Sequence, residues 1–433
     1  RTATDNFDNE DIKTWTLDRL VKEVKWCYDQ ALKEPNKFLE VKLNSYQAII
    51  DNYDYLKYSP TMLDFISWMA ITRFSNEETA LTKPARIFVI DGMDYFTPAA
   101  EFSNFKIPTY DTTSFLYYST KIFQTLTKAH KYDKDLEVLT FVELRRLDFM
   151  RNKCTLENKD TLYLDALTKL HAFTQGKKEN AETGYELATF YNTQGSKYNF
   201  ESAPQYKDFN KAAINIIDNV ANNFPGTRGA NNCNVLKEEI TKPSIELTFE
   251  STSYPGKPFE GILTYSNINE AYFRIIKVDY DKDSKMNSKI SSKEMVENYS
   301  KMAPVVEFST KLINPGDYNT HSTNIVFDGL NPGYYVILHS NNRDFDMSQG
   351  WVGYTSIWTT SLAYFLQMQN YQGGMFLVTD RLSGEPISGA RIDNYKEKYN
   401  FLTREYVFEK YKVLNTDANG KAYFEPAAKN SDY

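Results

Sequence analysis

The sequence predicts a multidomain protein in which an all-α, helical-repeat-like amino-terminal half precedes two antiparallel β-sandwich domains. Apolar residues recur every three or four positions up to about residue 240, the period of an amphipathic helix. Beyond Ile240 they alternate with polar residues, the period of a strand, and Pro-Gly and Asn-Gly pairs separate the runs. We expect domains at residues 1–238, 239–345 and 346–433, the last of them truncated.

Composition sets limits on the class of protein. A chain of 433 residues can hold two to four domains, and 41% hydrophobic with 25% charged residues fits a folded protein. The net charge of −7 gives no electrostatic footprint for nucleic acid or an anionic membrane. The sequence contains no run of 18 apolar residues. We therefore expect no nucleic-acid partner and no transmembrane segment in this piece.

The two ends suggest a piece of a longer chain. Residues 1–6 have no apolar signal-peptide core, so either the protein is cytoplasmic or a signal segment has been removed. Residues 427–433 follow a strand and read as the middle of a domain.

Three helices are expected in the first 75 residues. Thr16 caps the first, whose apolar face extends to Leu32. A second is expected over residues 38–56. The third is expected over residues 62–74, opened by Ser59-Pro60 as a cap and a proline in the first turn.

Residues 75–110 interrupt this rhythm with a long, proline-containing connection that includes a strand-like piece at residues 86–92. Helical stripes then resume at residues 115–129, 136–150, 163–173, 185–191 and 212–224. Successive pairs of these helices are separated by about 34 to 40 residues, which indicates stacked helical repeats. Residues 212–227 are similar to the second helix and turn of a tetratricopeptide unit. The other pairs lack that pattern, so we predict an irregular α-α array.

The strands of the first sandwich are expected at residues 246–250, 262–265, 272–278, 305–312, 324–327 and 334–340. Residues 279–300 are polar and are interpreted as a long hairpin arm or loop with a solvated face. Asp279, Asp281 and Asp283 have a calcium-loop spacing, but the Gly and Glu of such a loop do not follow. This favours a solvated turn.

The last sandwich is predicted from its turns. Residues 375–379 form an apolar strand, and Gly384, which is expected at φ > 0, lies in the turn before Pro386. Ile387 opens the next strand. Asn419-Gly420 lies between extended runs and indicates a hairpin.

We assign no catalytic, cofactor-binding or metal-binding residue, and we expect no enzyme. Cys27, Cys154 and Cys233 lack metal-ligand spacing and are expected to be buried packing residues, with one disulfide left open if the protein is exported.

The four histidines, which lack His-Glu-x-x-His spacing, are His130, His171, His321 and His339. His130 is interpreted as a dipole partner at a helix end. His171 is interpreted as a core residue with satisfied hydrogen bonds.

Several segments near the carboxyl end resemble the macroglobulin-type sandwich domains of the bacterial α2-macroglobulin family. They are Val378-Thr379-Asp380, Ser383-Gly384-Glu385-Pro386, Gly389-Ala390-Arg391-Ile392 and Asp417-Ala418-Asn419-Gly420. Carboxypeptidase-regulatory-like and other bacterial immunoglobulin-like modules use a similar series.

An upstream series, in the same order as in that family, resembles its first macroglobulin-type domains. It consists of residues 243–247, 254–258, 265–268, 273–277 and 329–336. The resemblance covers roughly residues 236–433, and a helical region also precedes these domains in relatives of the family.

The resemblance implies the non-catalytic amino-terminal part of an exported protease inhibitor that traps proteases by a conformational change. None of the three cysteines belongs to the family's Cys-Gly-Glu-Gln thioester motif. The implied partners are proteases, through the full-length protein, and other envelope proteins. The implied location is the periplasm, the outer membrane or the cell surface, with a signal peptide removed. The alternative is a cell-surface binding module for glycans or a peptide, and an enzyme ranks third.

Overall fold

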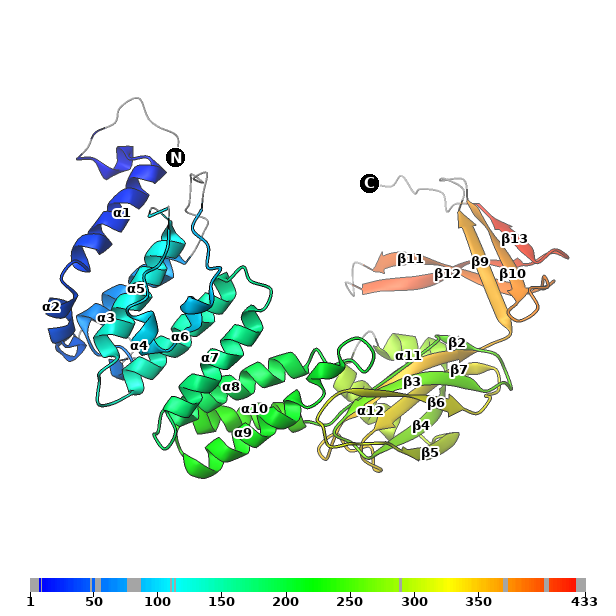
Figure 1. Ribbon diagram of the computed structural model, residues 1–433. Coiled ribbons are helices and arrows are strands. Elements are labelled where there is room, and N and C mark those ends of the chain that lie inside the picture. Colours follow the sequence, from blue (N-terminus) through cyan, green and yellow to red (C-terminus); the bar gives the residue numbers. More distant parts are fainter. Residues whose placement is uncertain are drawn as a thin grey trace. The chain divides into compact units, whose positions relative to one another are not determined.

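A computed structural model describes residues 8, 10–46, 49–50, 56–75, 87–109, 111–112, 114–287, 290–368, 373–400 and 405–425. The chain forms two compact units, Arg1–Ile240 and Thr241–Tyr433. The first is helical and the second contains mainly antiparallel sheets, which confirms the predicted fold class (Figure 1).

The helical unit stacks successive helices against their neighbours in the chain. Its helices are α1 (Leu17–Ala31), α2 (Pro35–Glu40), α3 (Met62–Phe74), α4 (Ala99–Phe102), α5 (Phe115–His130), α6 (Glu137–Lys153), α7 (Lys159–Phe173), α8 (Asn180–Gly195), α9 (Phe209–Asn223) and α10 (Arg228–Thr241). Short 3₁₀ turns lie at Ile12–Thr14, Leu43–Tyr46, Met93–Phe96 and Pro204–Tyr206. The predicted stripes form the core, where Phe123, Leu126, Val142 and Leu167 are fully buried.

The predicted helix over residues 38–56 is wrong. Helix α2 ends at Glu40, and Lys42 forms an isolated bridge with Thr61. Residues 47–48 and 51–55 of that range lie outside the described residues. The bounds of α3 match the prediction, but its cap does not, because Thr61 and Asp64 form a capping box after Pro60.

Two other parts of the helical unit differ from expectation. Helix α10 was not predicted, although Ala230, Cys233, Leu236 and Ile240 form a buried stripe at helical spacing. In the described part of the predicted strand-like piece, residues 87–92, only Ile90 makes a β-bridge, with Cys154.

The first β-sandwich has two sheets. Strands β1 (Ser244–Phe249), β3 (Phe259–Ser266) and β6 (His321–Phe327) form one sheet in the order β1-β3-β6. The other has the order β2-β8-β7-β4-β5, with β2 (Thr252–Ser253), β8 (Val352–Thr359), β7 (Gly333–Ser340), β4 (Glu270–Val278) and β5 (Val306–Lys311). The buried side chains of Leu263, Phe273, Phe327 and Ile337 belong to one core cluster of this sandwich. Because β8 pairs with β7, the sandwich extends past the boundary expected at residue 345.

The predicted polar arm at residues 279–300 is helical, which corrects the loop prediction. It contains α11 (Tyr280–Asn287) and α12 (Ser292–Ser300), and a capping box of Ser291 and Glu294 starts α12. Tyr299 is fully buried in a cluster with Val336 of β7, and its hydroxyl donates to Asp283 at 2.5 Å. Asp283 is therefore a buried helical residue, not part of a solvated turn. Helix α12 buries only Met295, Val296 and Tyr299, and these three residues were too few to form a recognisable helical pattern in the sequence.

The remaining strands form two small sheets. One has the order β13-β10-β9, with β13 (Lys421–Phe424), β10 (Gly374–Asp380) and β9 (Leu362–Met368). The other is the hairpin of β11 (Arg391–Asn400) and β12 (Glu405–Asn415). The Asn419-Gly420 turn forms, but the strands that it joins belong to different sheets, so the predicted hairpin pairing is wrong.

Candidate functional site

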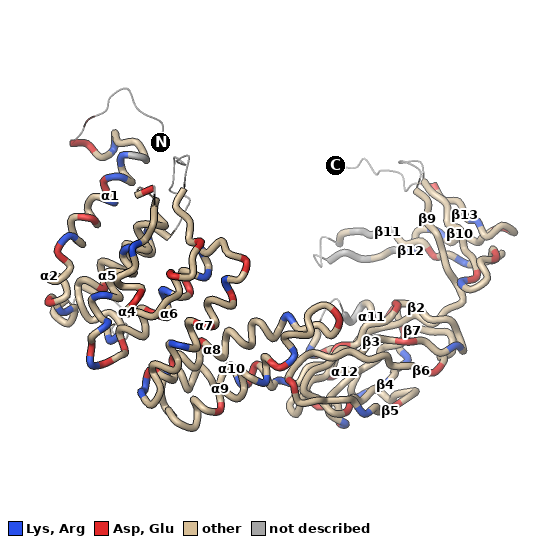
Figure 2. Tube along the Cα trace, viewed as in Figure 1, with Lys and Arg blue, Asp and Glu red and all other residues tan. Residues whose placement is uncertain are grey.

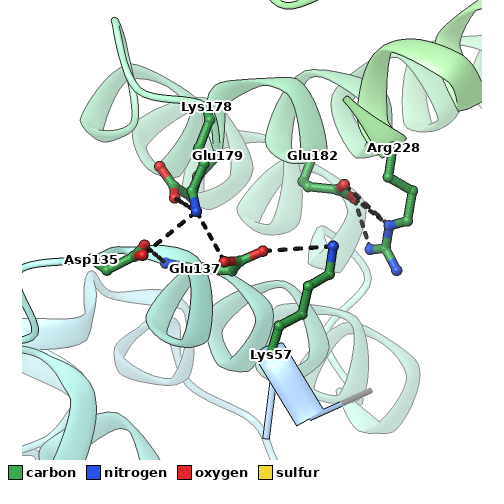
Figure 3. Close-up of polar contacts among 7 residues, drawn as sticks. All are labelled: Lys57, Asp135, Glu137, Lys178, Glu179, Glu182 and Arg228. Atoms are coloured by element: carbon green, nitrogen blue, oxygen red, sulfur yellow. Dashed lines mark hydrogen bonds and ion pairs between the residues drawn. The ribbon is translucent and has the colours of Figure 1, made fainter. Parts of the chain in front are cut away.

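A cavity of about 310 Å³ lies in the helical unit, where the first turns of α6, α8 and α10 meet the segment before α3. Its lining residues are Lys57, Tyr58, Glu137, Thr140, Phe141, Leu144, Lys178, Glu179, Glu182, Gly226, Thr227 and Arg228. Figure 3 shows that its charged side chains come from separate segments and point toward one another.

An aromatic pair forms the apolar part of this cavity. The ring of Tyr58 is buried and stacks on Phe141 with 5.1 Å between ring centroids. The Arg228 guanidinium carbon and the Lys57 ammonium nitrogen each lie 4.6 Å from the centroid of the Tyr58 ring. Both cations therefore interact with the electron-rich face of one ring.

Lys178 and Glu137 are at the centre of the ion network. The Nζ atom of Lys178 lies 2.9 Å from Oε2 of Glu137, 3.5 Å from Oδ2 of Asp135 and 3.7 Å from Oε1 of Glu179. The other carboxylate oxygen of Glu137, Oε1, lies 3.8 Å from Nζ of Lys57. Glu137 thereby links the segment that precedes α8 to the segment that precedes α3 (Figure 3).

Arg228, the first residue of α10, binds Glu182 of α8 through two nitrogens. Its Nη2 atom lies 2.8 Å from Oε2 of Glu182 and its Nε atom lies 3.1 Å from Oε1. Such a fork fixes orientation as well as distance. Gly229 permits this approach, because a Cβ atom there would lie 2.3 Å from the backbone carbon of Ala181.

The two adjacent carboxyl groups of Glu179 and Asp135 have pKa values that move apart. Burial raises the pKa of Glu179, and the Asp135 carboxylate beside it acts in the same direction. The backbone N–H of Glu137 and the Lys178 ammonium lower the pKa of Asp135. A hydrogen bond and the charge of Glu137 raise the pKa of Lys178, which remains cationic. The cavity thus offers both signs of charge beside an aromatic surface, an arrangement suited to recognising a polar group.

None of the four histidines lines this cavity, and their hydrogen-bond partners differ from one histidine to the next. His130, at the end of α5 as predicted, is buried between Asp64 and Asp133. His171 is half-buried and is not the core residue that was predicted, although its Nδ1 atom has a hydrogen-bond partner, the Thr183 hydroxyl at 2.9 Å. His321 contacts Asp317 at 2.9 Å, and burial lowers the pKa of His339 to about 4.

All three cysteines are free, so the disulfide left open by the sequence is not present. Cys154 and Cys233 are buried as predicted, and burial raises the pKa of Cys233 to about 12. Cys27 is exposed, contrary to the prediction. The described residues contain no group of three His, Cys, Asp or Glu side chains that could hold a metal ion.

Sequence reasoning did not identify the residues of this cavity. The available signal was the charged residues in the first turns of three helices, namely Glu137, Glu182 and Arg228. Charges at helix starts are common, and the pattern does not show which of them meet.

Within the described part of the chain, no helix is both long and apolar enough to cross a membrane.

Comparisons with known proteins give no family assignment. No protein-family model matches the chain, and no curated protein matches it. Among solved structures, surface layer protein SbsC, domains 1–6, matches with 11% identity and a TM-score of 0.15. The match covers 94% of this chain and 52% of that one, so the chain spans about half the length of that structure.

Proposed function

We propose that these 433 residues are the non-catalytic amino-terminal part of an exported α2-macroglobulin-like protease inhibitor. The protein would act in the periplasm, at the outer membrane or at the cell surface. Its partners would be proteases, engaged by the full-length protein, and other envelope proteins. In this proposal the sandwiches are a scaffold, and the helical unit contacts a partner.

The observation that carries the proposal is that residues responsible for the family resemblance build turns in the β module that contains β10 to β13. Oδ1 of Asp380 accepts hydrogen bonds from the backbone N–H groups of Leu382 and Ser383, at 3.0 and 2.9 Å. Gly384 follows at φ 75°. Gly420 also has a positive φ, of 73°, and a Cβ atom there would lie 2.4 Å from the carbonyl oxygen of Val378. The turn at Gly384 lies between β10 and β11, and the turn at Gly420 lies between β12 and β13.

A macroglobulin-type inhibitor must offer a bait for cleavage and then close around the protease. That transition requires a bistable body of several domains. The Cys-Gly-Glu-Gln motif is absent from the sequence, and we assign no bait segment in it. We therefore propose that the inhibitory function belongs to a larger polypeptide.

The test compares the 433-residue chain with the full-length gene product. Each is mixed with trypsin-like and elastase-like proteases, and cleavage of a large protein substrate and of a small peptide substrate is measured. We expect the full-length protein to suppress cleavage of the large substrate only. An inhibitor that has closed around a protease keeps large proteins from its active site, whereas small peptides still reach it. The 433-residue chain is expected to leave both rates unchanged. Stoichiometric inhibition by this chain alone would contradict the proposal.

The second candidate function is a cell-surface binding module, and the cavity of the helical unit favours it. Its charged rim and the Tyr58–Phe141 pair provide groups that could recognise a peptide or glycan. An array of peptides and cell-surface glycans would be probed with the wild-type chain and with Arg228→Gln. Lys237→Gln, which removes an exposed pair with Asp218, is the matched control. Binding that Arg228→Gln abolishes and the control retains, without any protease inhibition by the full-length protein, would favour this function over the first.

A further inference from the structure

Strand β9 is the outermost strand of its sheet in the described residues, and its side chains are unusually exposed. The sheet has the order β13-β10-β9, so one edge of β9 has no neighbouring strand there. Tyr364 is 70% exposed, Phe365 is 66% exposed and Met368 is 65% exposed. Large exposed apolar areas on a folded protein mark interaction sites.

β9 also lacks the charges that protect an exposed sheet edge. None of its seven residues is charged, and Figure 2 shows the strand as an uninterrupted tan segment. Among the other edge strands of the unit Thr241–Tyr433, β1 carries Glu246, β5 carries Glu307 and Lys311, and β13 carries Lys421, whereas the edge strands β2 and β6 carry no Asp, Glu, Lys or Arg. Charged residues on an edge discourage pairing with another chain. The sequence of β9 therefore suits a strand that is paired.

We propose that β9 pairs antiparallel with β9 of a second copy of this chain, across a two-fold axis at Phe365. This register places Leu362 opposite Met368 and Tyr364 opposite Leu366 in both directions. It joins two three-stranded sheets into one sheet of six strands. An antiparallel pair of identical strands is isologous, as a closed dimer requires.

The occupant is a second copy because β9 is compatible with itself. Under a two-fold axis a charge close to the axis lies near its own symmetry mate, which is destabilising. β9 has no charge to repel, and its cross-strand pairs are apolar except for Ala363 with Gln367. An axis at the centre of β1 would instead bring Glu246 close to its own symmetry mate.

The size of the surface indicates a reversible dimer. The exposed large apolar side chains on β9 are Leu362, Tyr364, Phe365, Leu366 and Met368. If each loses on the order of 100 Å², two copies bury at most about 1,000 Å², the lower end for a specific interface. We therefore expect the dimer to dissociate on dilution.

The first test is sedimentation of the full 433-residue chain over a range of concentrations. The wild-type chain is expected to dimerise. Phe365→Lys, which places two like charges at the axis, is expected to weaken dimerisation at least tenfold. Tyr423→Lys, on the opposite edge strand β13 and 62% exposed, is the matched control and is expected to leave the dimer intact. A wild-type chain that stays monomeric, or a dimer unaffected by Phe365→Lys, would overturn the proposal.

A second test determines the register of the proposed β9–β9 pair, and it does not require a substitution that disrupts the pair. In a Cys27→Ser background, Phe365→Cys places two thiols opposite each other at the axis. Opposed residues have Cβ atoms about 4.5–5.5 Å apart, close enough for a disulfide after a small adjustment. Ala363→Cys puts its two thiols four residues apart along the strands, roughly 14 Å. Oxidation should cross-link the Phe365→Cys chain far faster, and equal rates for the two variants would rule out the proposed register.

Discussion

The Nε2 atom of His130 lies 2.8 Å from Oδ1 of Asp64, and the two residues are 66 positions apart in the chain. The second oxygen of the same carboxylate, Oδ2, accepts hydrogen bonds from the backbone N–H and the hydroxyl of Thr61, at 2.9 and 2.7 Å. Asp64 thus caps its own helix, α3, and holds the end of α5 against it. Asp133 contacts the other ring nitrogen of His130 at 2.7 Å.

We predict that the stability of the helical unit falls as the pH rises above neutrality, and that His130 causes part of this fall. Burial disfavours the imidazolium, but the hydrogen bonds and charges of Asp64 and Asp133 outweigh burial and raise the pKa of His130. A raised pKa in the folded state stabilises the fold fully below the unfolded value of about 6.5. That contribution is lost as the pH rises through the folded pKa.

The measurement is urea unfolding of the wild-type chain and of His130→Gln between about pH 6 and pH 9, which spans the unfolded pKa of histidine. Helical circular dichroism would follow the transition of the helical unit. The difference in unfolding free energy between the two chains should shrink as the pH rises. Two parallel stability curves would show that His130 does not titrate as predicted.

We predict that Arg146→Leu destabilises the helical unit by about 3–5 kcal/mol, because it leaves the buried Glu143 carboxylate without its cation. Arg146 is fully buried, and it donates to Glu143 and to the backbone carbonyls of Tyr95 and Thr97. Adding Glu143→Leu to Arg146→Leu should recover part of the loss.

The control for Arg146 is Lys169→Ala, which breaks an exposed ion pair with Asp165 and should change stability by about 0.5 kcal/mol or less. Chemical unfolding of the wild-type chain and the three variants measures the effects. A loss for Arg146→Leu no larger than that of the control would argue against a stabilising role for the buried pair.

We predict that Gly384→Val costs on the order of 1 kcal/mol or more through backbone strain alone. Gly384 has φ 75°, as the sequence predicted, and no atom lies within 4 Å of the position a Cβ would take. Gly384→Asn should cost less, because asparagine tolerates this conformation better. Thermal unfolding of the three chains measures the order, and equal stability of Val and Gly would refute the assigned turn.

Much of the fold could be predicted because the decisive patterns are local. The stripe of α5 and the alternation of β4 are visible within single segments, since each buries one face. Helix α12 escaped this reasoning because Met295, Val296 and Tyr299 are its only buried residues, amid polar neighbours. The helix predicted over residues 38–56 failed because contacts of Val41 and Leu43 with residues 60–62 compete with helical hydrogen bonds.

The sequence by itself determined the change from helical to strand period near Ile240, the turn at Gly384 and the positions of most elements. Only the tertiary structure decided which charged residues meet. Glu137 and Lys178 are 41 residues apart in the chain, and Glu182 and Arg228 are 46 apart. A periodic pattern reports which face of an element is buried. It leaves no mark of the partner that a charged side chain finds on another helix, because that partner depends on how the helices stack.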